Sequence, residues 1–244
     1  MKIALILLAG GHSTRMGGPV PKTFITVKGR PIIRYSFDLL SPMFPRTIVV
    51  AHKAYHHLFP FNTQFAEPGP RRQDSVHNGF QMLPGFDFIL IHDGARPLLK
   101  KEDIERLINL GKTAPAAALA SPVKNTLKRV SYHRPSMAEI CYSKDASQIN
   151  TACLDPAVNG KDYGKSVIQG DTLSTVDRTN LFEVYTPQLI RSDLLKKGLA
   201  LNITVTDDLS FAEALGYTPL LVPCSFPNIK LTYPSDLPLI EALL

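Results

Sequence analysis

The sequence predicts an α/β fold, with a Rossmann-like, mostly parallel, twisted sheet that is flanked by helices and carries a protruding arm. Short apolar runs rich in β-branched residues, such as Ile3–Leu8 and Phe88–His92, alternate with amphipathic helical patterns. A Gly-Gly pair follows the first run directly, as in the turn from a buried parallel strand into a ligand loop. The 244 residues, 44% of them hydrophobic, are enough for one large domain with a sizeable core.

The individual elements follow from periodicity and from the residues that start and stop helices. Proline is tolerated at a helix start, so a helix should begin at Pro31, and Gly111 should end another. The first of these helices carries one apolar stripe, made of Ile32, Ile33, Ser36, Phe37 and Leu40. We expect strands at Ile3–Leu8, Thr47–Ala51, Phe88–His92, Ala116–Ala120, Leu220–Val222 and Ile229–Thr232. We expect the other helices at Asp74–Leu83, Glu102–Leu110, Gln188–Leu199, Asp208–Leu215 and Ser235–Leu244.

One stretch interrupts this alternation. From about Ser131 to Ser174 the chain is polar and aperiodic, and a loop of that length is unusual inside a compact domain. We therefore predict that residues 1–130 and 174–244 form the α/β domain. Residues 131–173 are predicted to be an inserted arm that serves dimerisation or acts as a lid.

Composition excludes several classes of protein. The formal charge of +6 is spread over scattered basic residues without a run of five, so no nucleic-acid partner is expected. No apolar run approaches the roughly 20 residues of a membrane span, and the apolar start runs straight into Gly-Gly, unlike a signal peptide. We therefore expect a cytoplasmic protein without a membrane partner. Three cysteines without CxxC spacing argue against a disulfide framework and a structural zinc site.

The strongest motif is the loop from Gly10 to Lys22, which directly follows the first predicted strand. Ligands of open α/β sheets bind beyond the carboxyl ends of strands, and glycines there let backbone N–H groups approach phosphate oxygens. Arg15 and Lys22 add charge-assisted donors. The loop is neither GxxxxGK[ST] nor GxGxxG, which argues against a P-loop and against a dehydrogenase. Gly-Gly alone would more often be a simple turn, but with these cations the loop indicates a phosphate site.

A second motif, His92-Asp93-Gly94-Ala95-Arg96-Pro97, ends another apolar strand. Asp93 can there meet a ribose hydroxyl, a metal ion or a substrate hydroxyl. For Arg96 we favour a structural role, locking the loop through a carboxylate, over phosphate binding. For His92 we favour a packed strand-end residue over a general base.

Other motifs are weaker when taken singly. In Arg71–Val76, Asp74 or Ser75 is either a helix N-cap or a group that reads a base edge, and both interpretations stay open. Arg178 alone would be a surface charge. Thr206-Asp207-Asp208 alone would be a helix cap with acidic first-turn residues.

Four further elements complete the set: Thr126, Thr175–Arg178, Thr186-Pro187-Gln188 and Asn228-Ile229-Lys230. Taken together and in this order, the motifs resemble the 2-C-methyl-D-erythritol 4-phosphate cytidylyltransferase family. The resemblance implies that Arg15 and Lys22 stabilise the transition state at the α-phosphate of CTP, and that Arg178 and Lys230 position the phosphate of the substrate. It implies substrate contacts from Asp93, Thr126 and Thr206. It implies nucleotide contacts from Ala9, Gly10, Gly11, Gly69, Ser75 and Ala95. It also implies Mg²⁺ as cofactor, with no assigned protein ligand, and a homodimer whose arms complete the partner's site.

Two departures from the family pattern keep alternatives open. The loop, Gly-Gly-His-Ser-Thr-Arg-Met with Pro-Val-Pro-Lys, resembles the related ribitol-5-phosphate cytidylyltransferases, and Thr23 stands where glutamine is usual in both families. The arm is longer than the family leads us to expect. A ribitol-5-phosphate cytidylyltransferase is therefore the first alternative. A catalytically inactive nucleotide-binding regulatory protein of the same fold is the second, although all four predicted catalytic cations are present.

Overall fold

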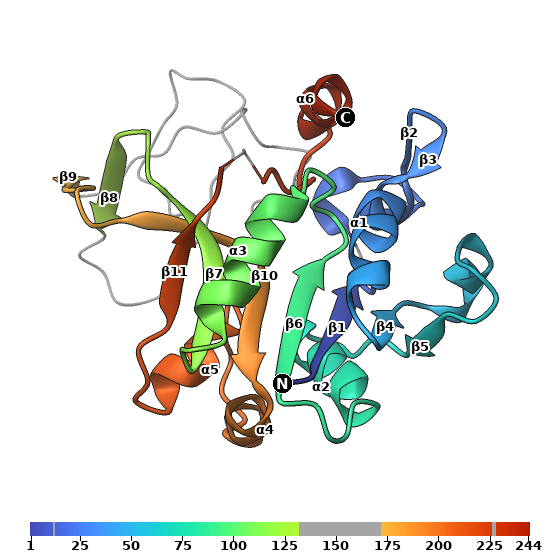
Figure 1. Cartoon of the computed structure of the whole chain (residues 1–244). Coiled ribbons are helices and arrows are strands. Elements are labelled where there is room, and N and C mark those ends of the chain that lie inside the picture. Colours follow the sequence, from blue (N-terminus) through green and yellow to red (C-terminus); the bar gives the residue numbers. More distant parts are fainter. Residues whose placement is uncertain (12, 132–171, 226–227) are drawn as a thin grey trace. The chain divides into compact units, whose positions relative to one another are not determined.

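The computed structural model describes residues 1–11, 13–131, 172–225 and 228–244 (Figure 1). The chain groups into two compact units, and each is treated by itself. The first comprises Met1–Ser13, Gly18–Ser121 and Val184–Leu244, and the second comprises Thr14–Gly17 and Pro122–Glu183. The predicted arm, 131–173, lies almost wholly outside the described residues.

The first unit is built on a seven-stranded sheet with the strand order β11-β7-β10-β6-β1-β4-β5. The strands are β1 (Ile3–Leu8), β4 (Thr47–Val50), β5 (Gln64–Ala66), β6 (Phe88–Asp93), β7 (Ala116–Pro122), β10 (Phe182–Arg191) and β11 (Leu220–Pro223). A separate short pair is formed by β2 (Thr26–Val27) and β3 (Arg30–Pro31). Strand β1 runs parallel to β4 and β6, whereas β10 is antiparallel to β6. The predicted mostly parallel α/β sheet is confirmed.

Helices cover both faces of this sheet (Figure 1). They are α1 (Ile32–Leu40), α2 (Arg72–Gln81), α3 (Lys101–Gly111), α4 (Ser192–Ala200) and α5 (Leu209–Ala214). The last helix, α6 (Asp236–Leu243), lies beyond the ends of the strands (Figure 1). Side chains alternate along a strand, so both faces of β1 need apolar residues and its sequence is apolar throughout. Within the described residues, no helix is both long and apolar enough to cross a membrane.

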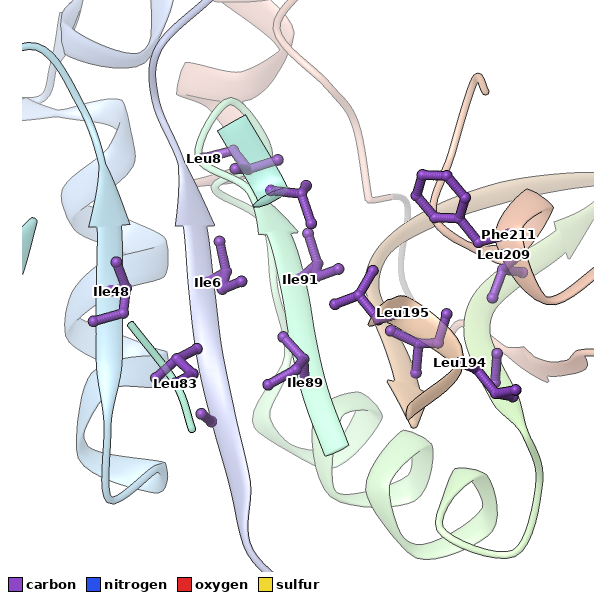
Figure 2. Packing of buried hydrophobic residues seen from close by; sticks show 14 of the residues in the cluster. Ile6, Leu8, Ile48, Leu83, Ile89, Ile91, Leu194, Leu195, Leu209 and Phe211 are labelled. Atoms are coloured by element: carbon purple, nitrogen blue, oxygen red, sulfur yellow. The ribbon is translucent and has the colours of Figure 1, made fainter. Parts of the chain in front are cut away.

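The two faces have distinct cores. On one face Leu5 packs with residues of α1 and α3, among them Leu40 and Ile104. On the other face Ile6 packs with α2, α4 and α5. Figure 2 shows part of this second cluster and labels Ile6, Leu8, Ile48, Leu83, Ile89, Ile91, Leu194, Leu195, Leu209 and Phe211. The predicted apolar stripe of α1 is the set of residues that this helix buries.

Strand register brings several loops to one edge of the sheet. Leu8, the last residue of β1, is paired with Val50 on one side and with Asp93 on the other. Val50 is in turn paired with Ala66 at the end of β5. The loops that follow β1, β4, β5 and β6 therefore start side by side, at the edge where α/β proteins bind ligands.

Two predicted elements are wrong. Gln188–Arg191 lies in strand β10 and not in a helix, because these residues pair with β6, and α4 begins only at Ser192. Ile229–Thr232 is not a strand. Its Leu231 N–H donates to the Ala95 carbonyl oxygen at 2.8 Å, so this segment is anchored to the loop after β6 instead of joining a ladder.

The second unit contains a two-stranded antiparallel sheet of β8 (Leu127–Ser131) and β9 (Thr172–Val176). Leu127 pairs with Val176, and Ser131 pairs with Thr172. The sequence analysis placed no strand here because most of these residues are exposed and no apolar alternation marks them.

Candidate active site

The loop after β1 begins with a close approach of two backbone segments. A Cβ atom placed on Gly10 would lie 2.5 Å from Cγ of Pro68, in the loop that follows β5. Only glycine fits at this position, and its lack of a side chain brings the Gly-Gly loop against the segment that leads to Gly69. Ala9, just before it, is 2% exposed, and its N–H donates to the Val50 carbonyl at 2.9 Å.

Side-chain hydrogen bonds close the same loop at its far end. The Lys22 backbone N–H donates to Oγ of Ser13 at 2.8 Å, and that hydroxyl donates to the Gly11 carbonyl at 3.3 Å. Thr23, which replaces the usual glutamine, donates from Oγ1 to the Ala9 carbonyl at 3.4 Å. Thr23 is buried, and it ties the residue after Lys22 back to the end of β1. This departure from the family pattern therefore has a structural role in holding the loop.

The start of α2 lies next to the Gly-Gly loop, at the same edge of the sheet. The Gly69 N–H donates to Oγ of Ser75 at 3.0 Å, and a Cβ on Gly69 would lie 2.9 Å from the carbonyl carbon of Asp74. The prediction that Asp74 or Ser75 is the N-cap is wrong, because the N-cap is Arg71. Asp74 instead occupies the third helical position, from which its carboxylate accepts the Arg71 N–H at 3.0 Å.

The carboxylate of Asp93 is held between two cations. Nε of Arg72 lies 3.1 Å from Oδ1, and Nζ of Lys230 lies 2.6 Å from Oδ2. Nη2 of Arg72 also lies 2.8 Å from Oδ2 of Asp208, a side chain with 0% exposure. The structure thus brings the predicted residues Asp93 and Lys230 together and adds Arg72 and Asp208, which the sequence analysis did not assign to the site.

Burial and charge act in opposite directions on this cluster. Burial alone would raise the pKa of Asp93, but the charges of Arg72 and Lys230 hold it well below its usual range. Burial likewise opposes the charge on Arg72, yet Asp208 and Asp93 raise its pKa above the ordinary value. Asp93 is therefore an ionised carboxylate at neutral pH, and Arg72 is a fixed cation.

His92 is enclosed behind this cluster and has no exposed surface. Oγ1 of Thr186 accepts the Asp93 backbone N–H at 3.0 Å, so its hydroxyl is free to donate to Nδ1 of His92 at 3.1 Å. Nε2 then carries the proton and faces the Arg96 carbonyl at 3.2 Å. Burial lowers the pKa of His92 to about 4. The favoured interpretation, a packed neutral histidine, fits this geometry.

Arg96 holds the segment that delivers Lys230. Its Nη1 donates to the Asn228 carbonyl at 2.6 Å, and its guanidinium lies 5.3 Å from the centre of the Tyr185 ring. Nδ2 of Asn228 donates to the Thr186 carbonyl at 2.6 Å. The favoured structural role of Arg96 agrees with these contacts, although its partner is a carbonyl and not the expected carboxylate.

Four further predicted site residues are exposed, whereas Ala95 is 2% exposed. Arg15 lies in the 3₁₀ helix η1 (Thr14–Met16), Thr126 precedes β8 and Arg178 follows β9, all three in the second unit. The Arg178 carbonyl accepts the Leu181 N–H at 3.0 Å, which forms a turn after β9. Thr206 is exposed in the first unit, two residues before Asp208.

The family model described as IspD: 2-C-methyl-D-erythritol 4-phosphate cytidylyltransferase matches residues 3–139 and 133–244. The chain belongs to this family. The 2-C-methyl-D-erythritol 4-phosphate cytidylyltransferase of Chlamydia pneumoniae is 34% identical over 251 residues, which cover 100% of both chains. The chloroplastic enzyme of that name from Oryza sativa subsp. japonica is 31% identical over 256 residues, which cover 99% of this chain and 74% of that protein.

The fold agrees with that of solved members of the family. The crystal structure of 2-C-methyl-D-erythritol 4-phosphate cytidylyltransferase from Thermus thermophilus has a TM-score of 0.71 and 24% sequence identity. The match covers 100% of this chain and 98% of that chain.

Two residues of the site, Arg72 and Asp208, were not predicted, because their role depends on a contact between distant parts of the chain. Arg72 stood in the motif Arg71–Val76, but only the helix-capping residues of that motif were considered. Thr206-Asp207-Asp208 was assigned to a helix cap, and Asp208 is the N-cap residue of α5. Its side chain makes no capping hydrogen bond, however, and Asp207 accepts the Ser210 N–H at 3.1 Å. The available signal was the charge pattern itself, because an arginine at the start of a helix beside a ligand edge needs a carboxylate partner when it is buried.

Proposed function

We propose that this chain transfers a cytidylyl group from CTP to 2-C-methyl-D-erythritol 4-phosphate and releases pyrophosphate, a step of isoprenoid precursor synthesis by the non-mevalonate pathway. The observation that carries the proposal is the family match over essentially the whole chain. The motif positions Arg15, Lys22, Arg178 and Lys230 are all kept as cations.

Electrostatics explains why the reaction needs these cations. CTP and the polyol phosphate are both strongly anionic, and two unit charges 4 Å apart repel by about 4 kcal/mol at an effective dielectric constant near 20. Several such pairs would prevent the two phosphates from meeting. In the proposed arrangement Arg15 and Lys22 face the triphosphate, while Arg178 and Lys230 face the phosphate of the acceptor.

The nucleophile needs no general base. A phosphomonoester has a second pKa of about 6 and is already ionised near neutral pH. One of its oxygens attacks the α-phosphorus of CTP, the bond from that phosphorus to the bridging oxygen breaks, and pyrophosphate leaves with the electron pair. Catalysis is then positioning plus stabilisation of charge on the transferring group. The buried, neutral His92 is consistent with a reaction that requires no base.

Different residues would bind the two substrates. The backbone of Ala9–Gly11 and Gly69, together with Ser75 and Ala95, would contact the nucleotide. Gly11 supports this assignment, because a Cβ atom placed on it would have no other atom within 4 Å, which leaves open space beside the backbone of the loop. Asp93, Thr126 and Thr206 would contact hydroxyl groups of the acceptor.

We propose that Mg²⁺ enters as part of the nucleotide substrate. Among the described residues, no three His, Cys, Asp or Glu side chains lie close enough together to hold a metal ion. Both carboxylate oxygens of Asp93 already face cations. Mg²⁺ prefers phosphate oxygens and water to an all-protein cage, so this donor set suits an ion carried by the triphosphate. The ion would supply charge neutralisation on the phosphates.

We also propose a homodimer, which rests on the family resemblance of the sequence. The arm that would make the exchange, 131–173, lies almost wholly outside the described residues. Light scattering coupled to gel filtration should give twice the chain mass of 26.9 kDa. A single-chain mass at micromolar concentration would reject the dimer.

Variant kinetics test the proposed roles. Lys22→Ala should lower turnover by about 10²–10³-fold, the scale for loss of one preorganised transition-state donor. Arg178→Ala should weaken use of the polyol phosphate and spare CTP binding. Lys101→Ala is the matched control, because this lysine of α3 is 60% exposed and its ion pair is with Glu105 of the same helix. Full turnover by Lys22→Ala, or equal loss of both substrates in Arg178→Ala, would reject the respective role.

A further inference from the structure

The two cations that contact Asp93 are not equivalent. Arg72 bridges two carboxylates, with Nε toward Asp93 and Nη2 toward Asp208. Lys230 has one ion-pair partner among the described residues, Asp93, which its ammonium group contacts. One cation of Asp93 is thus anchored at a second point and the other is not.

Asp208 is a rigid anchor for Arg72. Its side chain has no exposed surface, and its backbone N–H donates to Oε1 of Gln188, in β10, at 2.7 Å. Arg72 itself is the first residue of α2, whose Val76 is packed in the core. The guanidinium is therefore held between the end of β6 and the start of α5, with its planar fork facing the two carboxylates.

Lys230, by contrast, can change partner. Its side chain is 34% exposed, against 11% for Asp93, and an ammonium on a flexible stem has no fixed geometry. Under the proposed function Lys230 binds the phosphate of the acceptor. When its ammonium turns to that phosphate, Oδ2 of Asp93 loses its 2.6 Å donor and becomes available to a hydroxyl of the same substrate.

We propose that Arg72, fixed by Asp208, is a positioning residue that holds the Asp93 carboxylate while Lys230 exchanges from Asp93 to the substrate phosphate. The inference rests on the proposed function and deepens it. Arg72 keeps Oδ1 occupied throughout, so Asp93 stays ionised and oriented, with one oxygen open to the substrate. The site then recognises phosphate and hydroxyl together, which selects polyol phosphates over free polyols and over phosphates without a hydroxyl group in reach.

A pair of variants separates positioning from mere stabilisation of the fold. Arg72→Gln leaves Asp208 buried without its cation and should lower the Tm. Arg72→Gln combined with Asp208→Asn removes both charges and should recover most of that Tm. If Arg72 only stabilised the fold, activity would recover as well. We expect instead that kcat/KM for the polyol phosphate stays about 10²-fold low, because Asp93 has lost its fixed partner, while the Kd for CTP stays within about twofold.

Arg72→Lys gives a second, conservative test in case the neutral variants fold poorly. It keeps the charge but has no fork to span both carboxylates, so kcat/KM for the polyol phosphate should still fall by about tenfold or more. The matched control is Arg191→Gln with Asp193→Asn, an ion pair whose side chains are 44% and 47% exposed. It should leave the kinetics unchanged.

The outcomes distinguish this inference from the proposed function. If the wild-type protein turns over the polyol phosphate and the double variant does so equally well, the positioning role is overturned and the function stands. If Arg72→Lys keeps the wild-type kcat/KM, the requirement for a guanidinium that spans both carboxylates is likewise overturned. If the wild-type protein itself shows no turnover, both proposals are overturned. A recovered Tm with a persistent loss of kcat/KM supports the positioning role.

Discussion

His92→Gln should make the free energy of unfolding less dependent on pH than it is in the wild-type protein. The imidazole has no exposed surface, and burial lowers its pKa to about 4 in the folded protein. In the unfolded chain the value should be about 6.5. The folded state therefore disfavours the protonated form, and stability is lost as the pH falls from about 6.5 toward about 4.

The size of the effect follows from these two values. A difference of about 2.5 pKa units corresponds to about 3 kcal/mol when the pH lies below both values. Between about pH 7.5 and about pH 5, the titration of His92 alone should cost about 2 kcal/mol. Glutamine cannot titrate, so the variant should lack this part of the pH dependence, whatever its absolute stability.

Urea unfolding at a series of pH values measures this directly. The chain has no tryptophan, so circular dichroism is a better probe than fluorescence. The matched control is His57→Gln, the same substitution at an exposed histidine on the 3₁₀ helix η4 (Lys53–Leu58), which measures the effect of the substitution away from the core. Identical slopes for wild type and His92→Gln would refute the argument, since they would mean that His92 does not remain neutral in the folded protein.

Three further predictions follow from packing and from the proposed chemistry. Gly198→Ala should lower the free energy of unfolding by about 1–3 kcal/mol, because its Cβ would lie 2.7 Å from Cγ of Phe211 in the core. The control is Gly18→Ala, whose Cβ would have no atom within 4 Å, and equal stability of the two variants would contradict the packing at Gly198. Gly10→Ala should weaken CTP binding at least tenfold in a titration, because the new methyl group displaces Pro68 and with it the nucleotide loop; unchanged affinity would remove this loop from the nucleotide site. Excess EDTA should abolish turnover and added Mg²⁺ should restore it, whereas metal-independent turnover would reject the role of the ion.

The sequence predicted most of the fold because buried parallel strands are locally recognisable. Ile3–Leu8 is apolar at every position since both faces of β1 are covered, and the structure has this strand with the same bounds. The start of the 188–199 segment was mistaken for a helix, because Leu189 and Ile190 also fit a helical stripe with Leu194. Pairing with β6 decides the matter, and a local pattern cannot reveal it.

The candidate site was only partly predictable for the same reason. Asp93 and Lys230 could each be named from their motifs, but their contact depends on Arg96 binding the segment at Asn228. The Arg72–Asp208 pair joins residues 136 positions apart. The charge pattern indicates that Arg72 needs a carboxylate partner if it is buried, but only the structure identifies Asp208 as that partner.

The most direct measurement is pyrophosphate release from the wild-type protein with CTP and a small panel of acceptors. The proposed function predicts rapid release with 2-C-methyl-D-erythritol 4-phosphate, little with the unphosphorylated polyol, and slower release with ribitol 5-phosphate. It also predicts a marked preference for CTP over ATP and UTP. Release with ribitol 5-phosphate alone would replace the acceptor. Tight CTP binding without turnover of any acceptor would contradict the assignment of this chain as an active cytidylyltransferase.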